Sequence, residues 1–439
     1  MSNSDTDAAA TAHQYLPRSG TDAFHVDSYD LDLRYKVSNN RLDGTAVISG
    51  RAVIRLTRIA LDLVNLRAKK VRFDGDRRTR FTQTATHLIV QAPRPIEPGT
   101  AFAIEVEYAG MPAPRRSRWG TVGWEELTDG VLVASQPSGA PTWFPCNDRP
   151  ADKARYRIRI TAEQGYTVIA NGVLVDHTVA AGRGSWTYVQ EEPTATYLAT
   201  VQIGRYTVER RTIAGIDAIL AFPPALDHDV HTDFAPLSSM MELFQSTFGP
   251  YPFPTYTVVV TDDELEIPIE AQGMATFGAN HADGHGGSER LIAHELSHQW
   301  FGNSVGVAGW RDIWLNEGFA CYAEWIWSEA SGGRTADQQA RGHHFALRLK
   351  PHDLVLDDPG AEQMFDDRVY KRGACTLHAL RRTIGDDRFF ALLRTWVEEH
   401  RGGVVTTADF RAHAARYSPV PLDALFDAWL STRKLPPLP

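Results

Sequence analysis

The stretch from residue 289 to residue 329 constrains the fold more than any other part of the chain. It opens with His294-Glu295-x-x-His298, inside a run that contains no helix-breaking residue and repeats its apolar side chains at helical spacing. Residues four apart on a helix lie on the same face, so both imidazoles can reach one metal ion. The carboxylate of Glu295 lies one step around the helix and reaches a water on that metal without being a ligand. The sequence therefore predicts a metal-binding helix over 289–301.

A third ligand follows on a second predicted helix, Trp314 to Ala330. Glu317 comes 19 positions after His298. Two histidines and a glutamate leave the fourth tetrahedral position open for water, which is typical of a catalytic zinc site. The alternative is a structural set of His and Glu side chains without a metal. We predict one Zn²⁺ ion bound by His294, His298 and Glu317. Glu324, two turns after Glu317, is expected to accept the second ring hydrogen of a ligand histidine.

The motifs give the chain a family resemblance. HELSHQWFGN followed by WRDIWLNEGFACYAEW resembles the aminopeptidase N family of gluzincin zinc metallopeptidases, with HExxH and a glutamate after 18 further residues. The resemblance extends to WFPCNDRPADKARY at 143–156, FGPYPFPTY at 248–256 and VYKRGA at 369–374. It implies a zinc-dependent aminopeptidase that hydrolyses the N-terminal peptide bond of peptides, with free-amine peptides as its partners.

The resemblance also assigns roles to individual residues. It implies that Glu295 is the general base that takes a proton from water and passes it to the leaving amine. Tyr370, in VYKRGA, is expected to donate a hydrogen bond to the developing oxyanion. Gln136, Glu270 and the free edge of Glu317 are expected to bind the substrate amino group through charge-assisted hydrogen bonds.

The assignment of Glu270 depends on an altered motif. The family anchors the amino group with a Gly-x-Met-Glu-Asn strand, and the local sequence is EIPIEAQGMATFG. One alignment sets Gly273-Met274 on the Gly and Met of the motif, which removes the acid. The other sets the IEA tripeptide on Met-Glu-Asn and keeps Glu270 as the acid. We favour the second, because apolar and acidic residues alternate from 264 to 270 and Pro268 confines such a strand to a sheet edge.

Two kinds of pattern divide the chain into domains. Residues 1–20 are polar and are predicted to be disordered. From 21 to about 208, short stretches of alternating apolar and polar residues separated by turns predict an N-terminal all-β sandwich. From 209 to 439, a small sheet followed by many helical patterns predicts an α+β, mainly helical catalytic domain that resembles thermolysin's. The predicted fold is therefore multidomain, with the β-sandwich first.

The chain stops after DAWLSTRKLPPLP, near the end of the predicted catalytic domain. The resemblance therefore implies a short family member, without the long C-terminal helical domain and with a more open active site. One alternative, which an uncapped cleft would permit, is a zinc endopeptidase of the same chemistry. A non-catalytic binding scaffold that retains zinc for stability is the other.

Charge and composition narrow the partners and the compartment. The net charge of −9 and the absence of a basic stripe argue against a nucleic-acid partner. We find no apolar run long enough to span a membrane, and the N-terminus lacks the pattern of a signal peptide. The three cysteines are far apart and do not resemble a disulfide framework, which favours a reducing compartment. We therefore expect a cytoplasmic protein, and the sequence leaves its oligomeric state open.

Overall fold

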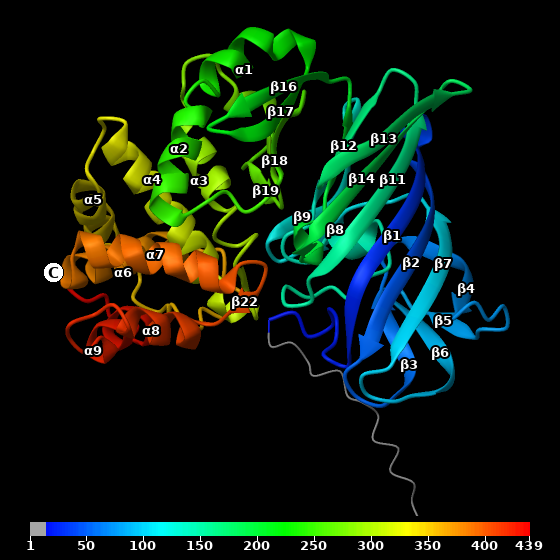
Figure 1. The fold of residues 1–439 in the computed structure, drawn as a ribbon, viewed down its shortest axis with the longest axis horizontal. Coiled ribbons are helices and arrows are strands. Elements are labelled where there is room, and N and C mark those ends of the chain that lie inside the picture. Colours follow the sequence, from blue (N-terminus) through cyan, green and yellow to red (C-terminus); the bar gives the residue numbers. More distant parts are fainter. Residues whose placement is uncertain (1–14) are drawn as a thin grey trace, which may run out of the picture. The chain divides into compact units, whose positions relative to one another are not determined.

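The computed structural model describes residues 15–439, and the chain divides into two compact units between Tyr206 and Thr207. The N-terminal unit is built from β-strands, and the C-terminal unit combines a five-stranded sheet with most of the helices (Figure 1). The predicted order of a β-rich domain followed by a mainly helical domain is confirmed. Among the described residues, no helix combines the length and apolar character that a membrane crossing requires.

The strands of the N-terminal unit form three sheets. They are β1 (Phe24–Lys36), β2 (Arg41–Ala52), β3 (Leu56–Asp62), β4 (Leu66–Phe73), β5 (Phe81–Gln83), β6 (His87–Ile96), β7 (Ala101–Gly110), β8 (Arg115–Ser117), β9 (Gly120–Leu127), β10 (Gly130–Ala134), β11 (Ala154–Glu163), β12 (Thr167–Ala170), β13 (Val173–Ala180), β14 (Arg183–Thr194) and β15 (Val201–Gly204). The sheet orders are β13-β14-β11-β1-β2-β7-β4, β12-β15-β10-β9-β8 and β3-β6-β5. Alternating side chains from all three sheets share one hydrophobic core, as in a sandwich.

The predicted disorder of residues 1–20 falls mostly on residues 1–14, which lie outside the described part of the chain. Tyr15 is buried, and the Gly20 N–H donates a hydrogen bond to the Asp62 carboxylate over 2.9 Å. The segment before β1 is therefore held by long-range contacts that its polar composition does not reveal.

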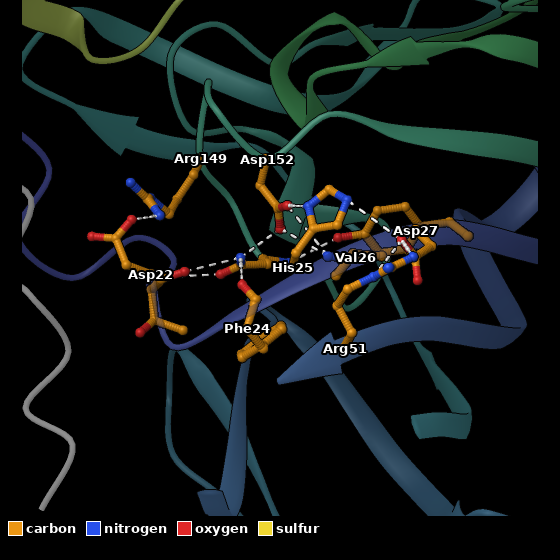
Figure 2. A network of polar contacts seen from close by, with 11 residues as sticks. Asp22, Phe24, His25, Val26, Asp27, Arg51, Arg149 and Asp152 are labelled. Carbon is orange, nitrogen blue, oxygen red and sulfur yellow. Dashed lines mark hydrogen bonds and ion pairs between the residues drawn. The ribbon is translucent and has the colours of Figure 1, made fainter. Parts of the chain in front are cut away.

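A partly buried polar network holds the start of β1. Asp152 is paired with His25 Nδ1 at 2.5 Å and accepts a hydrogen bond from Asn147 Nδ2 at 2.6 Å. Arg149 pairs with Asp22 beside it, and Figure 2 shows His25 and Asp152 at the centre of this network. Polar residues of the stretch WFPCNDRPADKARY therefore anchor the first strand of the largest sheet.

The C-terminal unit carries one mixed sheet surrounded by helices. Its elements are β16 (Thr207–Ile213), β17 (Ile216–Phe222), α1 (Asp227–Asp233), α2 (Leu237–Phe248), β18 (Thr255–Val260), β19 (Ile269–Ala271), β20 (Met274–Phe277), α3 (Glu289–Ser297), β21 (Gly306–Val307), α4 (Trp314–Ala330), α5 (Ala336–Arg348), α6 (Asp367–Ile384), α7 (Asp386–His400), β22 (Val404–Val405), α8 (Thr407–Ala415), α9 (Asp423–Phe426) and the π-helix η7 (Asp427–Ser431). The sheet order is β16-β17-β18-β20-β19, which leaves β19 at an edge.

The helix α4 runs through the core of this unit. Every residue from Trp314 to Trp327 is buried, which fits a helix that is apolar around most of its circumference. Glu317 and Glu324 are the only charged residues in that run. Because buried carboxylates are costly unless they are paired or bind a metal, these two residues mark where α4 meets polar partners.

Arg372 on α6 ties the last residues of the chain to the same core. Its side chain is almost fully buried and donates hydrogen bonds to the main-chain carbonyls of Trp429 at 2.8 Å and Arg433 at 3.0 Å. Further carbonyl partners of this guanidinium are Leu354, Ala428, Thr432 and Lys434. The helix that carries Tyr370 is therefore fastened to residues 428–434.

Candidate active site

The helix α3 brings the two histidines to one face. The His298 N–H donates to the His294 carbonyl over 3.2 Å, and His298 keeps right-handed helical angles (φ −56°, ψ −23°). The α-helix ends earlier than predicted, at Ser297. Beyond it some hydrogen bonds span three residues, as from the Trp300 N–H to the Ser297 carbonyl at 3.1 Å. Later ones span five, as from the Asn303 N–H to the His298 carbonyl at 3.0 Å. Gly302 then turns the chain with a φ of +113°, which favours glycine.

Glu317, in the first turn of α4, faces both imidazoles. Its Oε2 lies 3.6 Å from His294 Nε2 and 3.5 Å from His298 Nε2, and all three side chains are buried. A tetrahedral zinc ion with bonds of about 2.0–2.2 Å separates its ligand atoms by about 3.4 Å. The donor set and its spacing therefore fit one zinc ion.

The other ring nitrogen of each histidine has its own partner. His294 Nδ1 lies 2.8 Å from Glu324 Oε1, and His298 Nδ1 lies 3.1 Å from the Phe301 carbonyl oxygen. These contacts fix the ring orientations and leave both Nε2 atoms directed at Glu317. The structure thus brings Glu324 to the position that its helical spacing predicts.

The charges of the site suit a divalent cation. Burial acts to lower the pKa of His298, but Glu270 and Glu317 raise it to about 10. Burial acts to raise the pKa of Glu317, but His298 and His294 lower it to about 2. In the protein without metal, protons on the histidines therefore balance the carboxylates. A metal ion would take their place, because metal binding displaces protons from its ligands.

Glu295 has an oxygen atom without a protein partner. Its side chain is buried, and Oε2 makes no hydrogen bond to any residue from 15 to 439. Burial raises the pKa of this carboxyl group, against the effect of His294 and His298. Because a buried carboxylate oxygen without a partner is costly, this atom is expected to face water or substrate.

Glu270 lies on the edge strand β19, half-buried. The strand turns into β20 through Gly273, whose φ is +71°. A carboxylate oxygen of Glu270, one of Glu295 and a ring nitrogen of His298 lie within 4.8 Å of one another. The alignment that keeps Glu270 as the acid agrees with this placement, because β19 brings its carboxylate close to His298, one of the proposed metal ligands.

Tyr370 stands in the first turn of α6, beside the first histidine. Its ring is nearly parallel to the ring of His294, with centroids 6.1 Å apart and an interplanar angle of 21°. Burial and the nearby carboxylates of Glu317 and Glu270 raise the pKa of Tyr370 well above its usual range. The phenol therefore stays protonated and able to donate a hydrogen bond.

Gln136 belongs to the N-terminal unit, in the loop after β10, where it is half-buried. Its expected contact with the amino group of a substrate stays a prediction.

Two cations around Glu324 were not anticipated from the sequence. Arg290 donates to Glu324 Oε1 over 2.9 Å, and Lys371 Nζ lies 3.9 Å from Oε2 while donating to Cys321 Sγ. Burial acts to raise the pKa of Glu324, but His294 and these cations lower it to about 2. The placement of Arg290 could have been predicted from the sequence, because Arg290 precedes His294 by one helical turn and so lies on the same face of the helix.

Comparison with known proteins identifies the family of both halves of the chain. The model described as the peptidase family M1 domain matches residues 233–429, and that of the peptidase M1 N-terminal domain matches residues 25–198. Together the two models cover most of the chain.

Solved structures of similar length share the whole fold. An M1 zinc metallopeptidase from Deinococcus radiodurans, solved as a glutamate-to-alanine mutant bound to a Tyr-Ser-Ala substrate, superimposes with a TM-score of 0.91 at 29% identity. The match covers 98% of this chain and 99% of that one.

Curated relatives are longer. Human endoplasmic reticulum aminopeptidase 1 is 29% identical over 340 residues, which are 70% of this chain and 36% of that protein. The probable aminopeptidase 2 of Sulfurisphaera tokodaii is 24% identical over 438 residues, 92% of this chain and 53% of that protein. The chain thus spans about a third to a half of the length of these curated relatives.

Proposed function

Since the chain belongs to peptidase family M1, we propose that it is a zinc-dependent aminopeptidase that hydrolyses the N-terminal peptide bond of peptides. One observation carries the proposal. His294, His298 and Glu317 are spaced for one zinc ion, directly beside the unpartnered carboxylate oxygen of Glu295. That combination of an open metal position and a buried base suits hydrolysis better than a structural site.

Each side chain has a definite task in this mechanism. His294, His298 and Glu317 would hold the zinc ion, which would supply a Lewis acid for the scissile carbonyl and for the attacking water. Glu295 accepts the proton of the attacking water and passes it to the leaving amine. Tyr370 donates a hydrogen bond from its hydroxyl to the carbonyl oxygen as negative charge develops there.

The preference for a free N-terminus would come from carboxylates. Glu270 and the free edge of Glu317 offer acceptors to an ammonium group, and charge-assisted hydrogen bonds of this kind are strong. Gln136, from the N-terminal unit, would add a neutral acceptor. An N-acetylated peptide has no ammonium group, so it would lose these contacts and bind poorly.

We propose a single zinc ion. Two other groups of His, Asp and Glu side chains lie away from this site among the described residues, and each contains a glutamate that already pairs with an arginine. Arg416 donates to both oxygens of Glu399 at 2.6 and 2.7 Å, and Arg211 donates to Glu209 at 2.6 Å. Metal analysis of the purified protein should therefore give one equivalent of zinc, and two equivalents would refute this count.

A cytoplasmic location is part of the proposal. Cys146, Cys321 and Cys375 are buried free thiols, which favours a reducing compartment. We propose peptides as the partners, with no nucleic-acid or membrane partner. Cell fractionation would test the location, and recovery in an oxidising compartment would contradict it.

The decisive experiment is hydrolysis of a panel of aminoacyl-arylamides beside one N-acetylated control. We expect release from the free-amine substrates only, lost on chelation and restored by zinc. Cleavage of the acetylated substrate would indicate an endopeptidase instead. A protein that binds zinc but hydrolyses neither substrate would be a scaffold.

A further inference from the structure

The helices α4 and α6 touch through their main chains, at Gly318 and Gly373. A Cβ atom added to Gly373 would lie 2.8 Å from Gly318 Cα, and one added to Gly318 would lie 2.9 Å from Gly373 Cα. Side-chain Cβ atoms essentially never approach other atoms closer than 3.0 Å. Because both obstructing atoms belong to main chains, no side-chain rotation makes room. The two helices can be this close only if both positions are glycine.

The crossing lies next to residues of the proposed mechanism. Gly318 directly follows the metal ligand Glu317, and Gly373 comes one turn after Tyr370 on the first turns of α6. The ring of Tyr370 in turn lies against that of His294. The separation of the two helices therefore sets the distance from the Tyr370 hydroxyl to the metal ligands.

Glycine inside a helix carries a cost that calls for a reason. Relative to alanine, a glycine in a helix interior is unfavourable, because it loses more backbone freedom on folding. The crossing holds two of them, one on each helix. The close approach of the two backbones offsets this cost, and it lies beside residues of the proposed mechanism.

We propose that Gly318 and Gly373 are positioning residues for the reaction. Their contact holds the helix that carries Tyr370 against the helix that carries Glu317. It thereby positions the Tyr370 hydroxyl to donate a hydrogen bond to the carbonyl oxygen of the bound substrate. The proposal rests on the proposed function, in which Tyr370 stabilises the oxyanion. A misplacement of about 1 Å is enough to lower the rate of such a reaction by about 100-fold.

Alanine substitution at the crossing is the test. Gly373→Ala and Gly318→Ala are compared with Gly342→Ala on α5, a helical glycine around which an added Cβ meets nothing within 4 Å. At the crossing we expect kcat to fall by about 10- to 100-fold, with KM within about twofold and one equivalent of zinc retained. Gly342→Ala should keep the wild-type kcat, because it adds a methyl group in open space.

Several outcomes would overturn the proposal. A wild-type kcat in a folded Gly373→Ala or Gly318→Ala protein would show that the contact does not position Tyr370. The two variants are independent, so one suffices if the other does not fold. If neither variant folds in saturating zinc, the contact is purely structural. The same conclusion follows if the bound zinc falls in proportion to the activity.

A double variant separates positioning from general damage. Tyr370→Phe removes the hydrogen bond to the oxyanion. Adding Gly373→Ala to that variant should lower kcat by at most about a further twofold, because both changes act through the same hydrogen bond. Fully additive losses would contradict the proposal. If Tyr370→Phe alone leaves kcat unchanged, the oxyanion role in the proposed function fails. A loss with Tyr370→Phe but none with Gly373→Ala refutes only the positioning role.

Discussion

His294 Nδ1 and Glu324 Oε1 lie 2.8 Å apart, although the two residues are separated by 30 positions in the sequence. The histidine comes from α3 and the glutamate from α4, so this bond joins the two helices that position the proposed metal ligands. Arg290 donates to the same oxygen, and Lys371 faces the other one. Glu324 therefore stays ionised in a buried place and holds the imidazole in one orientation.

Glu324→Ala is expected to weaken zinc binding by about 10- to 100-fold, because His294 loses the partner that orients its ring. Competition with a chromogenic chelator measures the affinity. Glu398→Ala, an exposed glutamate on α7, is the matched control and should bind zinc as the wild type does. Equal zinc affinity for both variants would show that Glu324 does not support the metal site.

Glu295→Gln is expected to lower kcat by about 100- to 10,000-fold, since the amide cannot accept the proton of the attacking water. Zinc content should stay at one equivalent, because Glu295 is not a ligand. The variant should also resist thermal unfolding at least as well as the wild type, because a buried carboxyl group with a raised pKa has been replaced by a neutral one. Kinetics, metal analysis and calorimetry on one preparation check all three, and substantial remaining turnover would refute the base assignment.

Asp62 and Asp148 form a buried carboxyl pair in the N-terminal unit. The Asp148 N–H donates to Asp62 Oδ2 over 3.0 Å, and burial raises the pKa of each carboxyl group to about 7. In the unfolded chain both groups titrate near a pKa of about 4. The folded protein therefore binds more protons between these values, and its free energy of unfolding should fall as pH rises from about 4 to about 7.

Asp148→Asn should flatten that pH dependence and raise the free energy of unfolding at pH 8 by about 1–4 kcal/mol. Urea denaturation at pH 5 and pH 8 measures the difference. Asp176→Asn, at an exposed position on β13, should behave like the wild type at both pH values. The same decline in wild type and Asp148→Asn would place the titrating group elsewhere.

Arg372→Lys should lower the free energy of unfolding by about 2–4 kcal/mol, because an ammonium group cannot reach all the carbonyl oxygens that the guanidinium binds, and buried carbonyls then lose their donors. Chemical denaturation measures the loss. Arg388→Lys, an exposed arginine on α7, is the control and should be nearly neutral. No difference between the two variants would contradict the role assigned to Arg372.

Local periodicity was enough to predict much of the site. The predicted bounds of the second zinc helix, Trp314 to Ala330, are those of α4. A spacing of seven residues from Glu317 also predicted the face on which Glu324 lies, because helical geometry converts spacing into direction. The roles proposed for individual residues rest on the resemblance, since the oxyanion role expected of Tyr370 has no periodic signal in the sequence.

Contacts between distant segments could not be predicted in this way. The predicted end of the β-sandwich, near residue 208, falls inside β16, which with β17 opens the C-terminal unit. The partners of Arg372 lie up to 62 residues further along the chain. Likewise, nothing in the local pattern around Gly318 or Gly373 indicates which helix it meets. Such contacts depend on how helices pack, and a single sequence does not show that.

The crossing of α4 and α6 also limits which substitutions this protein can accept. At most core positions a larger residue on one side can be balanced by a smaller one on the other, so sequences drift while volume is conserved. Here both partners are already the smallest residue, and no compensating exchange exists. The separation of Glu317 and Tyr370 is therefore expected to stay fixed when other residues of the two helices are exchanged. Variation in substrate preference would have to arise in the surrounding loops, and an engineer seeking new specificity should leave this pair of helices untouched.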